Sequence, residues 1–143
     1  GILFVMVIMA VSMLAQVTDS ATVPVYLNVP EFVRLSVAPG DDGQFNLVFD
    51  LLNPDATVQD TVALLAEANV SYGVASSVSE VTGYESWASL VNVSIDTSVI
   101  GFGSAGVVTF DTTATINVID NLNLGTLTTN TKIADVIFTI SSL

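Results

Sequence analysis

The side chains of this sequence that could take part in chemistry are almost all carboxylates. The chain has 14 Asp and Glu residues against two cations, Arg34 and Lys132, and it lacks histidine and cysteine. These absences exclude Ser-His-Asp triads, Cys-His pairs, disulfides and zinc held by imidazole or thiolate. A carboxylate pair could hydrolyse a glycoside, but no spacing singles out two of the acids. We therefore expect a protein that is not an enzyme and needs no cofactor.

The net charge of −12 narrows the choice of partners. Nucleic acid and anionic membrane surfaces bind basic footprints, which two cations cannot form. Only 11% of the residues are charged, so the polar surface must consist mainly of Ser, Thr, Asn and Gly. That composition is typical of extracellular β-rich proteins, and the acidity is expected to keep their surfaces soluble and apart.

Calcium is the one metal whose preferred ligands the sequence offers. Asp41 and Asp42 stand in a glycine-containing turn, and Asp120 begins an Asn-rich one. Clustered oxygen ligands suit this cation, but neither stretch has the spacing of an EF-hand loop. Asp and Asn in turns more commonly bond their own main chain. We expect turn chemistry here, with calcium binding as the alternative.

Two short motifs and one aromatic pair could involve carbohydrate. Asn69 and Asn92 each begin an Asn-Val-Ser sequence, the acceptor pattern for N-glycosylation in a secreted protein. Tyr84 and the single tryptophan, Trp87, lie in a segment expected to be a loop. Such a pair could stack on a sugar, although packing of the loop onto the domain is the more common role.

Hydrophobic periodicity predicts an all-β domain. Phe45, Leu47 and Phe49 alternate with Asn46, Val48 and Asp50, as in a strand, and turn residues separate similar runs. About seven to nine short strands at this spacing favour an antiparallel β-sandwich or jelly roll. The expected strands are residues 23–30 (interrupted by two prolines), 32–37, 45–49, 61–76 after a short helical turn, 90–96, 99–101, 107–111, 113–119 and 132–142.

The first residues form a separate apolar segment. Residues 1–16 carry no charge, residues 17–22 form a polar linker, and residues 23–143 form the β domain. The apolar run is shorter than the roughly 20 residues of a membrane span, so no stable span is expected after assembly. Its shape, helix or strand, stays open. The expected polymerisation segment comprises Ile2, Leu3, Phe4, Val5, Met6, Val7, Ile8, Met9, Val11, Met13 and Leu14.

The strand pattern resembles a known group of filament subunits. The relevant stretches are Val23-Pro-Val-Tyr-Leu-Asn-Val-Pro, the later Ala68-Asn-Val-Ser-Tyr, and the closing Ile133-Ala-Asp-Val-Ile-Phe-Thr-Ile. They are similar to secreted microbial β-sandwich subunits of the TasA-type biofilm-fibre and archaeal bundling-pilus kind. The resemblance implies donor-strand complementation, in which one subunit's N-terminal strand completes the sheet of its neighbour. The uniformly apolar first segment also resembles the core helices of archaeal type IV pilins and flagellins.

These observations together predict a structural role. We expect a subunit of an extracellular, pilus-like filament on the cell surface, which polymerises with other copies of itself by burying residues 2–15 in its neighbours. The alternative is a secreted module that binds glycan or cell wall, in which the apolar run is a residual export signal with an h-region of about 7 to 15 residues.

Overall fold

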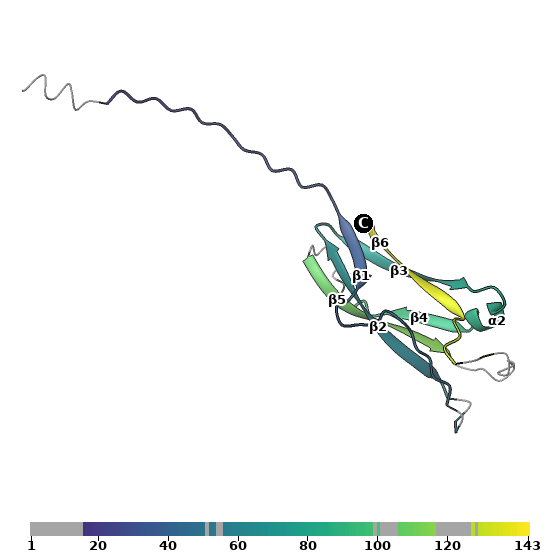
Figure 1. Ribbon diagram of the computed structural model, residues 1–143. Coiled ribbons are helices and arrows are strands. Elements are labelled where there is room, and N and C mark those ends of the chain that lie inside the picture. Colours follow the sequence, from purple (N-terminus) through teal and green to yellow (C-terminus); the bar gives the residue numbers. More distant parts are fainter. Residues whose placement is uncertain are drawn as a thin grey trace, which may run out of the picture.

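The computed structural model describes residues 16–50, 52–53, 56–98, 100, 106–116, 127 and 129–143. The described chain is mostly β-strand, and every pair of neighbouring strands is antiparallel. The all-β prediction is therefore confirmed. The elements are β1 (Val33–Val37), β2 (Val58–Ala68), β3 (Tyr72–Glu80), the short helix α2 (Glu85–Ala88), β4 (Val91–Ile95), β5 (Gly106–Ile116) and β6 (Ala134–Ser142), as labelled in Figure 1.

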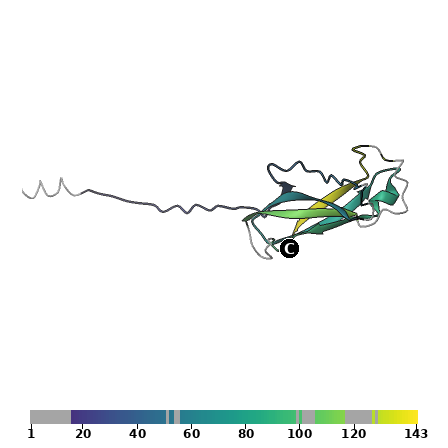
Figure 2. The same ribbon diagram turned by 90° about the horizontal axis from the view of Figure 1, so that it is seen from below.

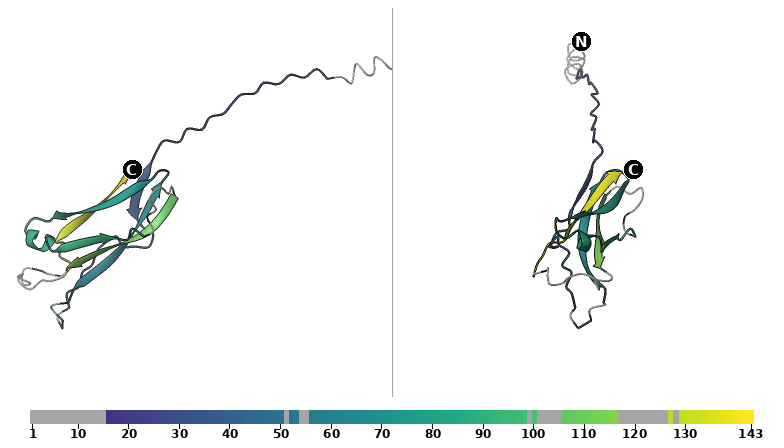
Figure 3. Two further views of the ribbon diagram at one scale, coloured as in Figure 1. Left: turned by 180° about the vertical axis from the view of Figure 1, so that it is seen from behind. Right: turned by 90° about the vertical axis from the view of Figure 1, so that its right-hand side faces the viewer.

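The strands form two sheets of unequal width. Sheet A has four strands in the order β1-β2-β5-β4, whereas sheet B has only β3 and β6. Side chains from both sheets meet in one core, where Tyr72 of β3 packs with Leu64 of β2 and Phe110 of β5. Figures 2 and 3 show the strands of the two sheets lying over one another. In the described residues, the two strands of sheet B therefore face the four strands of sheet A.

The β2–β5 ladder is the longest in the domain. All eleven residues of β2 pair with the eleven of β5, from Val58 opposite Ile116 to Ala68 opposite Gly106. Along both strands, alternate side chains are buried, as expected when one face of a pleated sheet meets a core. The single pairing register places all of these apolar side chains on the same face.

The registers also define two ends of the domain. The end where β1 begins, which we call the arm end, contains Val33, Ala68 and Ser142. The opposite end, which we call the far end, contains the start of β2, the start of β6 at Ala134, and the close of β5 at Ile116. The polypeptide enters at the arm end after a long extended segment, residues 16–31, which we call the arm (Figure 1).

Two expected strands form no ladder with the described residues. Residues 23–30 are extended but belong to the exposed arm, and residues 45–49 are extended beside β2 without sheet pairing. The described residues thus hold six strands, where the sequence analysis expected seven to nine. The polar linker expected at residues 17–22 is part of the arm.

Other element boundaries moved for identifiable reasons. The strand expected over residues 61–76 is two strands, because the chain turns at residues 69–71. The two strands expected over 107–111 and 113–119 form one strand, β5, as far as Ile116. Residues 117–119 of this prediction lie outside the described residues. The polar residue Thr112 separated the two predicted strands. It is fully buried, and its hydroxyl donates a hydrogen bond to the Val62 carbonyl oxygen at 2.7 Å. A satisfied hydroxyl can remain within a strand's buried face.

Two buried hydroxyl groups allow a test of this packing. The Tyr72 hydroxyl is buried and has no hydrogen-bond partner among the described residues, in contrast to that of Thr112. Replacing Thr112→Val removes a satisfied hydroxyl and should lower the free energy of unfolding by about 1 kcal/mol. Replacing Tyr72→Phe removes an unsatisfied one and should leave stability unchanged or raise it by about 1 kcal/mol. Urea unfolding measures both.

Thr115→Val provides the control, because Thr115 lies on the same strand but is only half-buried. A loss for Tyr72→Phe as large as that for Thr112→Val would contradict the assigned hydroxyl environments.

Candidate assembly site

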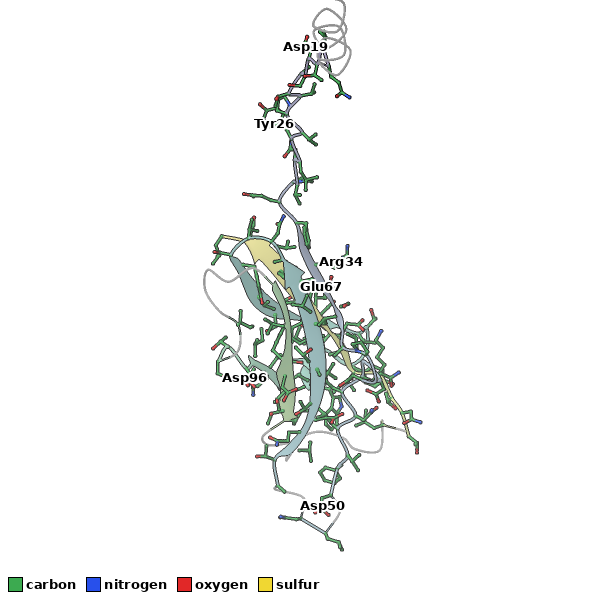
Figure 4. The ribbon with its side chains drawn as sticks, turned by 90° about the vertical axis from the view of Figure 1, so that its left-hand side faces the viewer. Asp19, Tyr26, Arg34, Asp50, Glu67 and Asp96 are labelled. Atoms are coloured by element: carbon green, nitrogen blue, oxygen red, sulfur yellow. The ribbon has the colours of Figure 1, made fainter. Side chains whose placement is uncertain are left out.

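The arm carries an alternating row of apolar side chains that the domain leaves in solvent. Val23, Val25, Leu27 and Val29 recur at every second residue, and Val25 and Leu27 are 94% and 88% exposed. In an extended chain such residues share one face. The stretch from residue 20 to residue 30 has no charged side chain. Figure 4 shows Asp19 and Tyr26 on the arm, well beyond the sheets.

The base of the arm is fixed to the domain by Asn69. Its side-chain oxygen accepts from the Phe32 main-chain N–H at 2.8 Å, and its amide nitrogen donates to the Pro30 carbonyl oxygen at 2.9 Å. The Asn69 main-chain N–H also donates to the Phe32 carbonyl oxygen at 3.3 Å. One side chain therefore sets the direction in which the chain leaves the arm end. Figures 1 and 3 show the arm running away from both sheets.

An open groove of about 1190 Å³ lies in the far half of the domain. Its floor is the inner face of sheet A, including Val58, Val62 and Ile116, and one wall is the first half of β6 from Ala134 to Phe138. No residue of β3 lines it. The groove is therefore the part of sheet A that a third strand of sheet B, beside β6, would cover.

Burial along the strands agrees with this missing cover. The inward-facing residues of β2 are buried from Val62 to Ala68, but they are only half-buried at Val58 and Asp60. On β6, the core-facing side chains are half-buried along the whole strand; they are Ala134, Val136, Phe138 and Ile140. Apolar residues in these positions stabilise a domain fully only when a further element covers them.

The other wall of the groove is residues 43–50, which we call the strap. Phe45, Leu47 and Phe49 of the strap are half-buried toward the groove, and the Phe45 ring lies 6.4 Å from that of Phe138 on β6. The strap is held by side chains: the Asp60 carboxylate accepts from the Asn46 main-chain N–H at 2.7 Å. Asp50, at its end, lies at the opposite end of the molecule from the arm (Figure 4).

Asp41 accepts hydrogen bonds at the edge of β2, at the point where β1 ends. One carboxylate oxygen accepts from the main-chain N–H of Ala63 and the other from that of Gly43, each at 2.9 Å. These bonds, first that from Ala63, hold the pKa of Asp41 below its ordinary value. Gly43 adopts a positive φ of 70°, a conformation that glycine accepts without strain.

The calcium alternative finds no support in this geometry. Asp42 accepts from the main chain of Gln44 and the side chain of Asn46, so both carboxylates at the turn are engaged in the turn chemistry that was expected. Across the described ranges, no three acidic side chains are grouped so that they could hold a metal. Asp120 lies outside the described residues.

The carbohydrate candidates have different environments. Asn92 is exposed on β4, whereas the side chain of Asn69 is occupied at the base of the arm; glycosylation of either stays a prediction. Trp87 is only 6% exposed on α2, with Tyr84 half-buried before it. The tryptophan therefore packs onto the domain and offers no exposed face for stacking on a sugar.

Both cations of the chain are engaged in surface ion pairs. Arg34 of β1 lies 3.4 Å from Glu67, its register partner on β2, and Lys132 lies 2.7 Å from Asp135. Both pairs are exposed, so each contributes little to stability. The surface that remains is strongly acidic.

The structure separates what was expected from what the sequence did not reveal. The predicted polymerisation segment, residues 2–15, lies outside the described residues. The alternation of Val23, Val25, Leu27 and Val29 was visible in the sequence, but it was interpreted as a strand of the chain's own sheet. The groove depends on contacts between distant segments, and no local pattern indicated it. Among the described helices, none has the length and apolar character needed to cross a membrane.

Comparisons with protein-family models, with curated proteins and with solved structures found no match for this chain.

The Asp41 bonds predict a pH-dependent contribution to stability. A carboxyl whose pKa is lowered in the folded state stabilises the fold above its ordinary value of 3.8, and this contribution is lost as the pH falls through the lowered value. Asp41→Asn should therefore unfold at lower urea than the parent protein at pH 7. The two urea midpoints should converge as the pH falls below about 4.

Asp111→Asn is the matched control, because it removes one charge from an exposed position on β5. Equal midpoint shifts for the two variants at pH 7 would show that general charge, rather than the bonds to Ala63 and Gly43, is responsible.

Proposed function

We propose that this protein is a non-enzymatic structural subunit of an extracellular, pilus-like filament, in which the arm of each copy is buried in the next. The observation that carries the proposal is the exposed row Val23, Val25, Leu27 and Val29 on an uncharged extended segment. A contiguous apolar row of this kind in solvent marks an interaction site. The alternation of a strand indicates that the partner is a sheet.

The energetics support a stable joint. Burial of a large apolar side chain contributes about 1.5 to 3 kcal/mol, and the row contains four. Main-chain hydrogen bonds of strand addition would add to this, and the costs of association and ordering subtract from it. An arm of one copy in a different surface of the next is a heterologous contact, which propagates into a filament.

The proposal is also consistent with the β-sandwich expected from the sequence. A strand supplied by a neighbour would add to the six strands of the described residues and would widen sheet B opposite sheet A. Residues 2–15, directly before the arm, remain in this proposal a second buried segment, within the filament rather than in a membrane. The partners are other copies of the chain, and the site of assembly is the cell surface.

Charge placed on the apolar face of the arm tests the proposal. Val25→Asp with Leu27→Asp should abolish filaments in electron micrographs and leave a species of monomer size in sedimentation, because two carboxylates cannot be buried unpaired. Domain stability should be unchanged, since both side chains are exposed.

Thr22→Asp with Asn28→Asp adds the same charge to the opposite face of the arm and should still form filaments. Loss of filaments in both double variants, or in neither, would refute a role for the alternating face.

A further inference from the structure

We propose that the groove beside β6 is the receptor for the arm of a second copy, which adds as an antiparallel third strand to the open edge of β6. This inference rests on the proposed function and names the surface on the accepting subunit. Three independent features of the described residues support it: the positions of arm and groove in the domain, the direction of the free main-chain groups, and the placement of the two prolines in the arm.

The arm and the groove belong to opposite ends of the domain. The arm leaves beside Val33 at the arm end, whereas the groove is lined from the far half, by residues such as Val58, Ile116 and Ala134. Figure 1 shows the arm projecting away from the end where β6 begins. Copies stacked in a row therefore bring the arm of one to the groove of the next, without any change in the domain.

The orientation follows from this stacking. An arm that reaches in from the far end has its N-terminal residues deepest, so its chain runs from the arm end of the acceptor toward the far end. β6 runs the other way, from Ala134 at the far end to Ser142 at the arm end. The added strand is thus antiparallel to β6, like every other pair in the domain. An arm folded back into its own domain would run parallel to β6 instead.

The free edge of β6 presents its even-numbered residues. The Leu143 N–H donates to the Ser71 carbonyl oxygen, directly opposite it in the β3–β6 register, so odd-numbered residues direct their main-chain groups toward β3. The even-numbered residues therefore direct theirs away from β3, toward the groove side. Among the described residues no strand pairs with this edge, although β1 lies close to the second half of β6. The first half of β6, from Ala134 to Phe138, borders the groove. The even-numbered residues are also those whose side chains face the core.

The arm meets this edge with residues of the matching kind. Opposite residues of an antiparallel pair place their side chains on the same face, so the apolar, odd-numbered residues of the arm must stand opposite the even-numbered residues of β6. Their N–H and C=O groups then point at β6. Pro24 and Pro30, which have no N–H, are even-numbered, and their nitrogens point away from the ladder. Both prolines are thus compatible with pairing on this side only.

Length and side-chain size suggest one register. The stretches Val23–Val29 and Ala134–Ile140 each have seven residues, about 23 Å of strand at roughly 3.3 Å per residue. With Leu27 opposite Val136, Val25 faces Phe138 and the smallest β6 residue, Ala134, faces Val29. In this register Val25, Leu27 and Val29 stand opposite the three core-facing residues of β6 that line the groove, and Val23 stands opposite Ile140, in the half of β6 that lies near β1.

Disulfide trapping tests the assignment, and the absence of native cysteine makes every cross-link attributable. A chain with Leu27→Cys and Val136→Cys should, after assembly and oxidation, give a ladder of covalent multimers on a non-reducing gel. The control joins Leu27→Cys to Val78→Cys, because Val78 stands opposite Val136 on β3 and is one strand farther from the proposed arm. This pair should give at least tenfold less multimer. Pairing Leu27→Cys with Ala134→Cys or Phe138→Cys checks neighbouring registers.

Each outcome has a defined meaning. Multimers through residue 134, 136 or 138 support the β6 edge, and the strongest of the three gives the register. Multimers through residue 78 alone, or a disulfide within one chain, would overturn it. Normal filaments with no cross-link at any of these positions would reject this receptor while leaving the proposed filament intact. Absence of filaments from the unsubstituted protein would reject the proposed function itself.

Discussion

The β2–β5 ladder is the constraint on which the rest of the structure depends. Its eleven paired residues present one continuous apolar face, with β1 on one flank and β4 on the other. This apolar face must be covered along its whole length. At the edge of β2, however, β1 is only five residues long and pairs with the last five residues of β2. The remaining edge of β2 and the inner face beside it are therefore left to other groups.

Where the pairing of β1 with β2 ends, carboxylate side chains accept hydrogen bonds from main-chain N–H groups. The Asp41 carboxylate accepts a hydrogen bond from the Ala63 main-chain N–H, and the Asp60 carboxylate accepts one from the Asn46 main-chain N–H of the strap. Side-chain bonds of this kind satisfy main-chain donors, but they do not impose the register of a continuous ladder. The strap can thus lie over the edge of the groove without occupying a place in either sheet. Among the described residues, no strand pairs with the edge of β6 that faces away from β3.

The sequence predicted the parts of this arrangement that are encoded locally. Alternation along β1 and β6 was sufficient to identify those strands, and the absence of His and Cys excluded most catalytic chemistry. It could not reveal that residues 23–30 pair with none of the described strands of their own domain, because the same alternation is found in a strand of any sheet. Nor could it show that Thr112 continues a strand, since that depends on the Val62 carbonyl oxygen across the ladder. Pairing partners are long-range properties, and a single sequence does not specify them.

In the filament that we propose, electrostatics favours a joint built from the arm. Copies of a chain with a net charge of −12 repel each other at distances beyond contact, although salt at physiological strength screens this repulsion over about 8 Å. Both cations are already paired within their own chain, so no positive group of the described residues is left to attract a neighbour. In the proposed filament, the attraction between copies would come from apolar burial and main-chain hydrogen bonds, which act only at contact. An uncharged stretch from residue 20 to residue 30, held clear of the acidic domain by the Asn69 bonds, is suited to that task.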